Sequence, residues 1–284
     1  MRSLTDIASL SADEIQTILK VKLDGRFARG PTRTIALMFH EHSTRTRFSF
    51  TQAALFAGMT PVDLNPSISS EMKGETTVDT CRNLDWMGAR AIVLRTSVNG
   101  LPEAVSRVVG IPVINAGDGT NEHPSQALGD ALTLLQHFKR IEGLRVAIVG
   151  DVDNSRVARS NAHLLTKLGA SVRCVAASVP RNLPALCTES LEFGLAGADV
   201  VMILRWQDER HLAGRSTKEA YRIDEAVLQQ LAPKAMVMHP GPVNRGIEVT
   251  SDVVDGPRSL VASQVQHGVQ ARMKILYHLL ESES

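Results

Sequence analysis

The sequence predicts an α/β protein of two domains, each a parallel sheet flanked by helices. The chain has 284 residues, of which 43% are hydrophobic, and this is more apolar material than one compact core usually takes up. Short apolar segments alternate with longer, amphipathic ones, which is typical of βα units and of a parallel sheet. The alternation runs through both halves of the chain, so we expect two such sheets.

The first half predicts a leading helix followed by a βα series. Ser11 and Glu14 form a capping box, which opens an amphipathic helix that runs to about Val21. Apolar runs then predict strands at 34–39, 61–64, 91–94 and 112–115. Between them, helices are predicted at 44–58, 75–87 and 101–109.

The second half repeats the pattern between two helices that link the domains. Residues 128–138 predict a helix that leaves the first half, and strands follow at 144–149, 172–175, 200–204 and 236–238. The segment 260–280 has helical periodicity with Gly268 as its one breaker, and it is long enough to return and pack on the first half. We therefore predict one domain from 1–134 with 262–284, and another from 135–261.

Charge and cysteine content exclude several classes of protein. A net charge of +1, with 21% charged residues, gives no electrostatic footprint for nucleic acid or an anionic membrane. The three cysteines have no metal-ligand spacing, so neither a disulfide framework nor a bound metal is expected. No secretory signal and no apolar stretch of membrane-spanning length stands out. We expect a cytoplasmic protein.

The segment 43–47, Ser-Thr-Arg-Thr-Arg, has the features of a phosphate-binding turn. It lies between the strand that ends at Phe39 and a helical run, so backbone N–H groups and the positive end of the helix dipole would face a bound anion. The Arg45 guanidinium adds a charged fork suited to phosphate oxygens. The alternative is an N-capped helix with solvated arginines. A nucleotide P-loop is excluded, since the glycine-rich spacer and Gly-Lys-Ser/Thr are missing.

Taken with later motifs, this turn resembles the signature of the aspartate/ornithine carbamoyltransferase family. His123 to Gln126 stand as the His-Pro-x-Gln motif of that family. The segments 150–161, 205–210 and 239–246 follow in the family's order, so the resemblance spans nearly the whole chain. It implies an enzyme that transfers the carbamoyl group of carbamoyl phosphate to an amine and releases phosphate, with no metal or organic cofactor.

The resemblance also implies roles for individual residues. Those expected to bind carbamoyl phosphate are Ser43, Thr44, Arg45, Thr46, Arg95, His123, Gln126, Gly241 and Pro242. Those expected to bind the amino acid are Lys73, Arg156, Arg205 and Gln207. The residues expected to be catalytic are Arg45, Thr46, Lys73, Arg95 and His123. Ser69 and Lys73 would reach the site of a neighbouring subunit, which implies a homotrimer with shared sites; a mobile, solvated loop is the alternative.

The C-terminal motifs favour aspartate as the second substrate. Ornithine enzymes of the family carry His-Cys-Leu-Pro and Ser-Met-Gly segments, whereas this chain has His-Pro-Gly-Pro at 239–242. A cationic ornithine beside Arg205 would be repelled, and a dicarboxylate would be attracted. The product would be N-carbamoyl-L-aspartate, an intermediate of pyrimidine synthesis.

Some positions depart from the family pattern and leave alternatives open. His42 stands where many relatives have proline, Thr96 stands where histidine is common, and the regions 179–192 and 211–221 are compressed. Another amino acid as acceptor therefore stays open, as does a catalytically silent subunit that scaffolds a partner such as dihydroorotase. A regulatory chain is a further open partner. A plain oxidoreductase is excluded, because only Gly150 of the dinucleotide-binding fingerprint follows the strand at 144–149.

Overall fold

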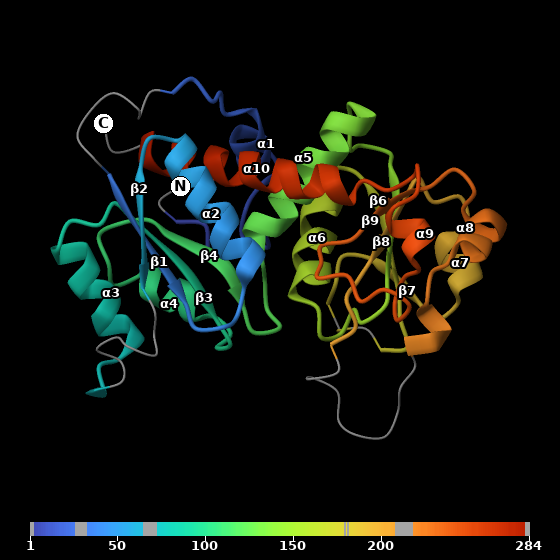
Figure 1. Cartoon of the computed structure of the whole chain (residues 1–284), viewed down its shortest axis with the longest axis horizontal. Coiled ribbons are helices and arrows are strands. Elements are labelled where there is room, and N and C mark those ends of the chain that lie inside the picture. The colour runs from blue at the N-terminus through green and yellow to red at the C-terminus, as the bar shows by residue number, and fades with distance from the viewer. Residues whose placement is uncertain are drawn as a thin grey trace. The chain divides into compact units, whose positions relative to one another are not determined.

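The computed structural model describes residues 3–25, 33–64, 73–178, 180, 182–207 and 218–281. The chain forms two compact units, unit 1 from Met1–Gly129 with Gly268–Ser284, and unit 2 from Asp130–His267. Each unit is built on a parallel sheet with helices beside it (Figure 1), which confirms the predicted fold class. Within the described ranges, no helix combines the length and the apolar character that crossing a membrane requires.

Unit 1 holds a four-stranded sheet in the order β2-β1-β3-β4, with every pair parallel. Its strands are β1 (Thr34–Phe39), β2 (Thr60–Leu64), β3 (Ala91–Thr96) and β4 (Val113–Asp118). The N-terminal segment adds a parallel bridge from Leu4 to Ile114 of β4. Apolar side chains that include Met38, Ile92 and Val105 form a buried cluster on this sheet.

Within its described residues, unit 1 contains four helices of its own. They are α1 (Ala12–Lys20), α2 (Thr44–Phe56), α3 (Thr77–Trp86) and α4 (Leu101–Ser106). The capping box predicted at the start of α1 is confirmed, because the Ser11 hydroxyl accepts from the Glu14 N–H and the Glu14 carboxylate accepts from the Ser11 N–H. The amphipathic pattern of this helix buries Ile15, Ile18 and Leu19.

The chain passes between the units within two helices, α5 (Pro124–Phe138) and α10 (Val261–Glu281). Gly129 of α5 and Gly268 of α10 lie so close that a Cβ atom added at Gly129 would stand 3.2 Å from the Gly268 Cα atom. Gly268 therefore does not interrupt the helix; it allows the two helix backbones to approach. The predicted domain boundaries at 134 and 262 stay predictions, and they lie in these same two helices.

Unit 2 holds a five-stranded parallel sheet in the order β7-β6-β5-β8-β9. The strands are β5 (Arg145–Val149), β6 (Ser171–Val175), β7 (Leu186–Thr188), β8 (Val200–Ile203) and β9 (Met236–Met238). The helices beside them are α6 (Arg156–Lys167), α7 (Leu191–Leu195), α8 (Glu225–Leu231) and α9 (Ser251–Val254), with a short 3-10 helix at Lys218–Tyr221. Their apolar faces bury a cluster that includes Val149, Ile203 and Leu228.

Candidate active site

The predicted phosphate turn joins β1 to α2 in unit 1. Ser43 is the residue before the helix, but its hydroxyl makes no capping hydrogen bond, and the first turn of α2 contains no acidic residue. The Ser43 hydroxyl therefore does not supply the cap that the alternative, an N-capped helix with solvated arginines, requires. Thr46 is buried, whereas Thr44 and Arg45 are exposed. The positive end of α2 thus lies, without a cap from the Ser43 side chain, at the place where an anion was predicted.

The two arginines of this turn have different surroundings. Arg47 Nη1 lies 3.1 Å from a carboxylate oxygen of Asp63 in β2. The Arg47 guanidinium also stands 5.2 Å above the Phe39 ring of β1. Arg47 therefore fastens the start of α2 to the sheet, and Arg45 is the exposed arginine of the pair.

Arg95 lies at the carboxyl end of β3, directly opposite Phe39 of β1. Its Nη1 donates to the Ala116 carbonyl at 3.3 Å, and its Nε lies 3.3 Å from a Glu41 carboxylate oxygen. Sequence reasoning missed Glu41, although its position between a buried strand and a basic turn is a usable signal. The neighbouring Thr96 is buried, and its hydroxyl accepts from the Val98 N–H at 3.1 Å.

His123 is buried directly before α5, so the His-Pro-x-Gln motif forms the start of that helix. The His123 carbonyl accepts from the Gln126 N–H at 3.0 Å and from the Ala127 N–H at 3.2 Å. The His123 Nδ1 atom lies 3.4 Å from the Ser125 hydroxyl. The predicted helix began at 128, and the motif residues extend it by a turn.

Two buried carboxylates hold the segment that leads to His123. Glu122 accepts from the backbone N–H groups of Ile7 at 2.8 Å and Ala8 at 3.1 Å. Asp118, at the end of β4, accepts from the Glu122 N–H at 3.0 Å and from the Gly100 N–H at 2.7 Å. The N-terminal segment thus fixes the backbone beside His123, which the sequence did not reveal.

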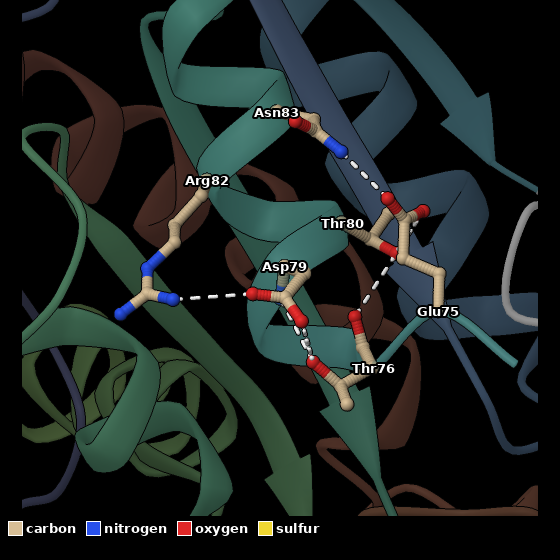
Figure 2. Close-up of polar contacts among 6 residues, drawn as sticks. All are labelled: Glu75, Thr76, Asp79, Thr80, Arg82 and Asn83. Carbon is tan, nitrogen blue, oxygen red and sulfur yellow. Dashed lines mark hydrogen bonds and ion pairs between the residues drawn. The ribbon is translucent and has the colours of Figure 1, made fainter.

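Lys73 is exposed in a turn shortly before α3, whereas Ser69 lies outside the described residues. Figure 2 shows a polar cluster that begins two residues after Lys73. The Glu75 carboxylate accepts from the Thr80 hydroxyl at 2.9 Å and from the Asn83 amide at 2.6 Å. At the helix start, Thr76 caps α3 through the Asp79 N–H at 3.1 Å. The residues that directly follow Lys73 and Gly74 are therefore held to α3 by hydrogen bonds.

The predicted amino-acid ligands of unit 2 follow two neighbouring strands. Val149 of β5 lies opposite Ile203 of β8, so the chain leaves both strands at the same edge of the sheet. Arg156 is buried as the first residue of α6 after β5, and Arg205 is half-buried after β8. The Gln207 N–H donates to a carboxylate oxygen of Asp151 at 3.1 Å, and the Gln207 side-chain amide donates to the Asn154 carbonyl at 3.0 Å.

The segment after β9 carries Gly241 and Pro242, which are joined by a cis peptide bond. His239 is buried at its start, where Nδ1 accepts from the Gly241 N–H at 2.8 Å. The other ring nitrogen, Nε2, lies 3.1 Å from an oxygen of the buried Glu248 carboxylate. Because Nδ1 is the acceptor, Nε2 carries the proton and donates to Glu248.

The 43–47 turn and Arg95 in unit 1, and Arg156 and Arg205 in unit 2, lie beside the switch point of their sheet. In unit 1 the order β2-β1-β3-β4 reverses direction between β1 and β3, the strands that precede the 43–47 turn and carry Arg95. In unit 2 the order reverses between β5 and β8, which precede Arg156 and Arg205. Parallel sheets bind ligands at such points, beyond the carboxyl ends of the strands. The arrangement defines a two-domain α/β protein with basic side chains beyond the carboxyl ends of both sheets.

Comparison with known proteins identifies the family within this class. Residues 2–136 match the model for the aspartate/ornithine carbamoyltransferase carbamoyl-P binding domain, and residues 142–279 match the Asp/Orn binding domain of the same family. The chain belongs to the aspartate/ornithine carbamoyltransferase family.

Curated relatives and solved structures agree with this assignment. The chain is 43% identical to the aspartate carbamoyltransferase catalytic subunit of Gluconobacter oxydans, over 98% of this chain and 95% of the relative. It is 41% identical to the corresponding subunit of Acetivibrio thermocellus, over 100% of this chain and 97% of the relative.

Two solved structures represent the two branches of the family. Ornithine carbamoyltransferase from Pyrococcus furiosus matches with a TM-score of 0.88 and 27% identity, over 99% of this chain and 97% of that one. Aspartate transcarbamoylase from Trypanosoma cruzi, in complex with N-(phosphonacetyl)-L-aspartic acid, matches with a TM-score of 0.86 and 28% identity, over 98% and 96%.

Proposed function

We propose that this chain is an aspartate carbamoyltransferase, which joins the carbamoyl group of carbamoyl phosphate to the amino group of L-aspartate. The products are N-carbamoyl-L-aspartate and inorganic phosphate, a step of de novo pyrimidine synthesis. Curated relatives that cover nearly the whole chain support the assignment, since they are named as catalytic subunits of that enzyme. The observation that carries the choice of aspartate is the placement of Arg156 and Arg205 after adjacent strands of unit 2.

In unit 1, the proposed role of the 43–47 turn is to hold the phosphate group. Ser43, Thr44 and Thr46 supply hydroxyl and backbone donors, and Arg45 supplies the guanidinium fork. Arg95 bridges phosphate and the carbonyl oxygen, a task for which its contact with Glu41 and its hydrogen bond to Ala116 fix its orientation.

The reaction moves negative charge onto the carbonyl oxygen and the leaving phosphate. The amine attacks the carbonyl carbon, the bond from that carbon to the phosphate oxygen breaks, and the departing phosphate takes the proton of the amine. His123 and Arg95 donate to the carbonyl oxygen, and one such donor typically lowers the barrier by about 3 kcal/mol. Gln126 and the carbonyl groups of Gly241 and Pro242 are the proposed partners of the carbamoyl NH₂ group.

In unit 2, the proposed ligands of aspartate are two arginine forks and an amide. Arg156 and Arg205 pair with the carboxylates, since a guanidinium forms two parallel hydrogen bonds with a carboxylate. Gln207 assists, and its position is set by its hydrogen bonds to Asp151 and Asn154. Ornithine would place a cation near these arginines, which disfavours it as the acceptor.

The proposed assembly is a homotrimer in which Ser69 and Lys73 complete the site of a neighbouring subunit. Large apolar side chains are exposed on unit 1, including Phe48 and Phe56 on α2 (63% each) and Trp86 at the end of α3 (78%). Covering such side chains favours association between subunits. A cytoplasmic location and a further partner, either a regulatory chain or dihydroorotase, stay predictions.

Product formation by the purified chain tests the proposed function. Carbamoyl phosphate is supplied with L-aspartate, with L-ornithine, or with a panel of other amino acids, and the ureido product is measured. We expect turnover with aspartate and none with ornithine. Turnover with a different amine would overturn the choice of acceptor, and no turnover with any amine would favour the silent scaffold.

A further inference from the structure

Glu248 is a buried carboxylate of unit 2 that accepts hydrogen bonds from two separate segments. One oxygen, Oε1, accepts from His239 Nε2 at 3.1 Å and from the Asn244 N–H at 2.6 Å. The other oxygen, Oε2, accepts from the Trp206 N–H at 3.5 Å. The side chains of Glu248 and His239 are 4% and 0% exposed, so neither group depends on bulk water for its partners.

The two segments are the ones that carry proposed ligands of unit 2. Trp206 stands between Arg205 and Gln207, the proposed aspartate ligands. Its N–H donates to Glu248 and so connects that segment to the carboxylate. His239 and Asn244 enclose Gly241 and Pro242. We propose that Glu248 is a positioning residue, whose carboxylate holds the 205–207 segment at a fixed distance from the 239–244 segment and so sets the affinity for aspartate. This inference rests on the proposed function.

A chain of hydrogen bonds fixes His239 from its other side. The His239 N–H donates to the Gln264 side-chain carbonyl at 2.8 Å, and the Gln264 amide donates to Asp130 at 2.9 Å. The second oxygen of Asp130 accepts from the Asn161 amide at 2.9 Å. His239 is thereby tied to residues of α5, α6 and α10 within unit 2. Glu248 is in turn held by its own carbonyl, which accepts from the Ile223 N–H at 2.9 Å.

The role requires a group that only accepts hydrogen bonds. Among the described residues, the partners of the Glu248 side chain are three N–H donors, and an ionised carboxylate offers acceptors on both oxygens. In E248Q, an amide oxygen at the Oε1 position still accepts the hydrogen bonds from His239 and Asn244. The amide NH₂ then faces the Trp206 N–H, donor against donor. The opposite orientation is worse, because the NH₂ would face two donors. E248Q therefore breaks the contact with the 205–207 segment selectively.

The experiment compares steady-state kinetics of the purified full chain with those of E248Q. The control is E192Q, which removes the same charge from an exposed position of the same unit. Circular dichroism and thermal unfolding establish that each variant is folded. We expect the KM for aspartate to rise about tenfold or more in E248Q, as for a buried donor left without its acceptor. The KM for carbamoyl phosphate should stay within about twofold, and kcat within about threefold.

Two variants of His239 keep the test decisive if E248Q does not fold. In H239N, the side-chain oxygen can still accept from the Gly241 N–H, but the side chain is too short to reach Glu248. In H239Q, the amide nitrogen can still donate to Glu248. We expect H239N to raise the KM for aspartate more than H239Q does.

Failure of the inference is separate from failure of the proposed function. A wild-type chain that does not use aspartate overturns the proposed function, whatever the variants do. An active wild type, with a folded E248Q that matches E192Q, overturns the positioning role. A fall in kcat that matches the loss of folded protein, with neither KM changed, also overturns it. So do equal KM values for aspartate in H239N and H239Q.

Discussion

Arg47 forms an ion pair with Asp63 at 3.1 Å and therefore serves the packing of α2 on its sheet. The arginine two positions earlier, Arg45, is exposed at the same helix start. Of the two alternating arginines in this motif, Arg47 therefore has a structural contact, and Arg45 is the one proposed to bind phosphate.

We expect Arg47→Ala to lower stability and to leave substrate binding intact. The pair is half-exposed, so its loss together with the contact to the Phe39 ring should cost about 1 kcal/mol of unfolding free energy. Urea unfolding measures this change, and the KM for carbamoyl phosphate should stay within about twofold. A large rise in that KM would show that Arg47 also contacts the substrate.

Arg45→Ala should abolish turnover without changing the fold. The substitution removes the proposed phosphate fork and leaves the Arg47–Asp63 ion pair of α2 in place. Circular dichroism should match the wild type, while carbamoyl phosphate binding by calorimetry should be lost. Retained activity would overturn the assignment of this turn.

Glu122→Gln should destabilise unit 1. The Glu122 carboxylate accepts from the N–H groups of Ile7 and Ala8, and an amide would turn its NH₂ group toward one of them. An unpaired buried donor costs about 1–3 kcal/mol. The midpoint of urea unfolding should fall accordingly. Glu142→Gln, at an exposed position, serves as the control and should unfold like the wild type.

The ion pair of Asp199 with Arg145 gives stability that depends on pH. Burial acts to raise the pKa of Asp199, but hydrogen bonds from the side chain and backbone of Arg145 outweigh it, so the pKa lies below the ordinary 3.8. A lowered pKa in the folded state contributes stability above the ordinary value, and this contribution is lost as the pH falls through the folded value. Asp199→Asn should therefore unfold more easily than the wild type at pH 7, and the difference should shrink below 3.8. A difference that is constant over this range would contradict the assignment.

Thiol labelling should distinguish Cys187 from the other cysteines. Cys187 is exposed, whereas Cys81 and Cys174 are buried. Burial, with the neighbouring Cys187 thiol, raises the pKa of Cys174 to about 12, so almost no thiolate is present there at neutral pH. One equivalent of a thiol reagent should react with the folded protein, and Cys187→Ser should remove that reaction. Burial also raises the pKa of Cys187, so labelling should accelerate as the pH rises. Fast labelling of two thiols would refute this.

Local patterns in the sequence were sufficient to predict most strands of both sheets. They also predicted which candidate ligands follow directly after a strand. The strands that precede the 43–47 turn and that contain Arg95 are continuous apolar runs, because both faces of a parallel sheet are covered. Ligands that directly follow such runs can be placed at the edge of the sheet from the order of residues alone. The strand β7 was missed because it has three residues, and two of them are exposed.

The buried carboxylates beside these predicted ligands could not be predicted in the same way. Glu122 meets Ile7 across 115 positions of the sequence, and Glu248 meets Trp206 across 42. Neither acid belongs to a periodic pattern, because each is buried by a contact that forms only after folding. Gly268 illustrates the same limit, since its close approach to Gly129 depends on a helix far away in the sequence.

The return of α10 to unit 1 has a consequence for synthesis of the chain on the ribosome. Unit 2 is one continuous stretch, so all of its residues have been made before the part of α10 that belongs to unit 1, from Gly268 onward, emerges. Unit 1 lacks Ile275, Leu276 and Tyr277 until then, although all three are buried in the finished protein. The nascent first unit therefore keeps an uncovered apolar face through most of translation. A stop codon just before Ile275 would leave that face open, even though every proposed substrate ligand had already been made.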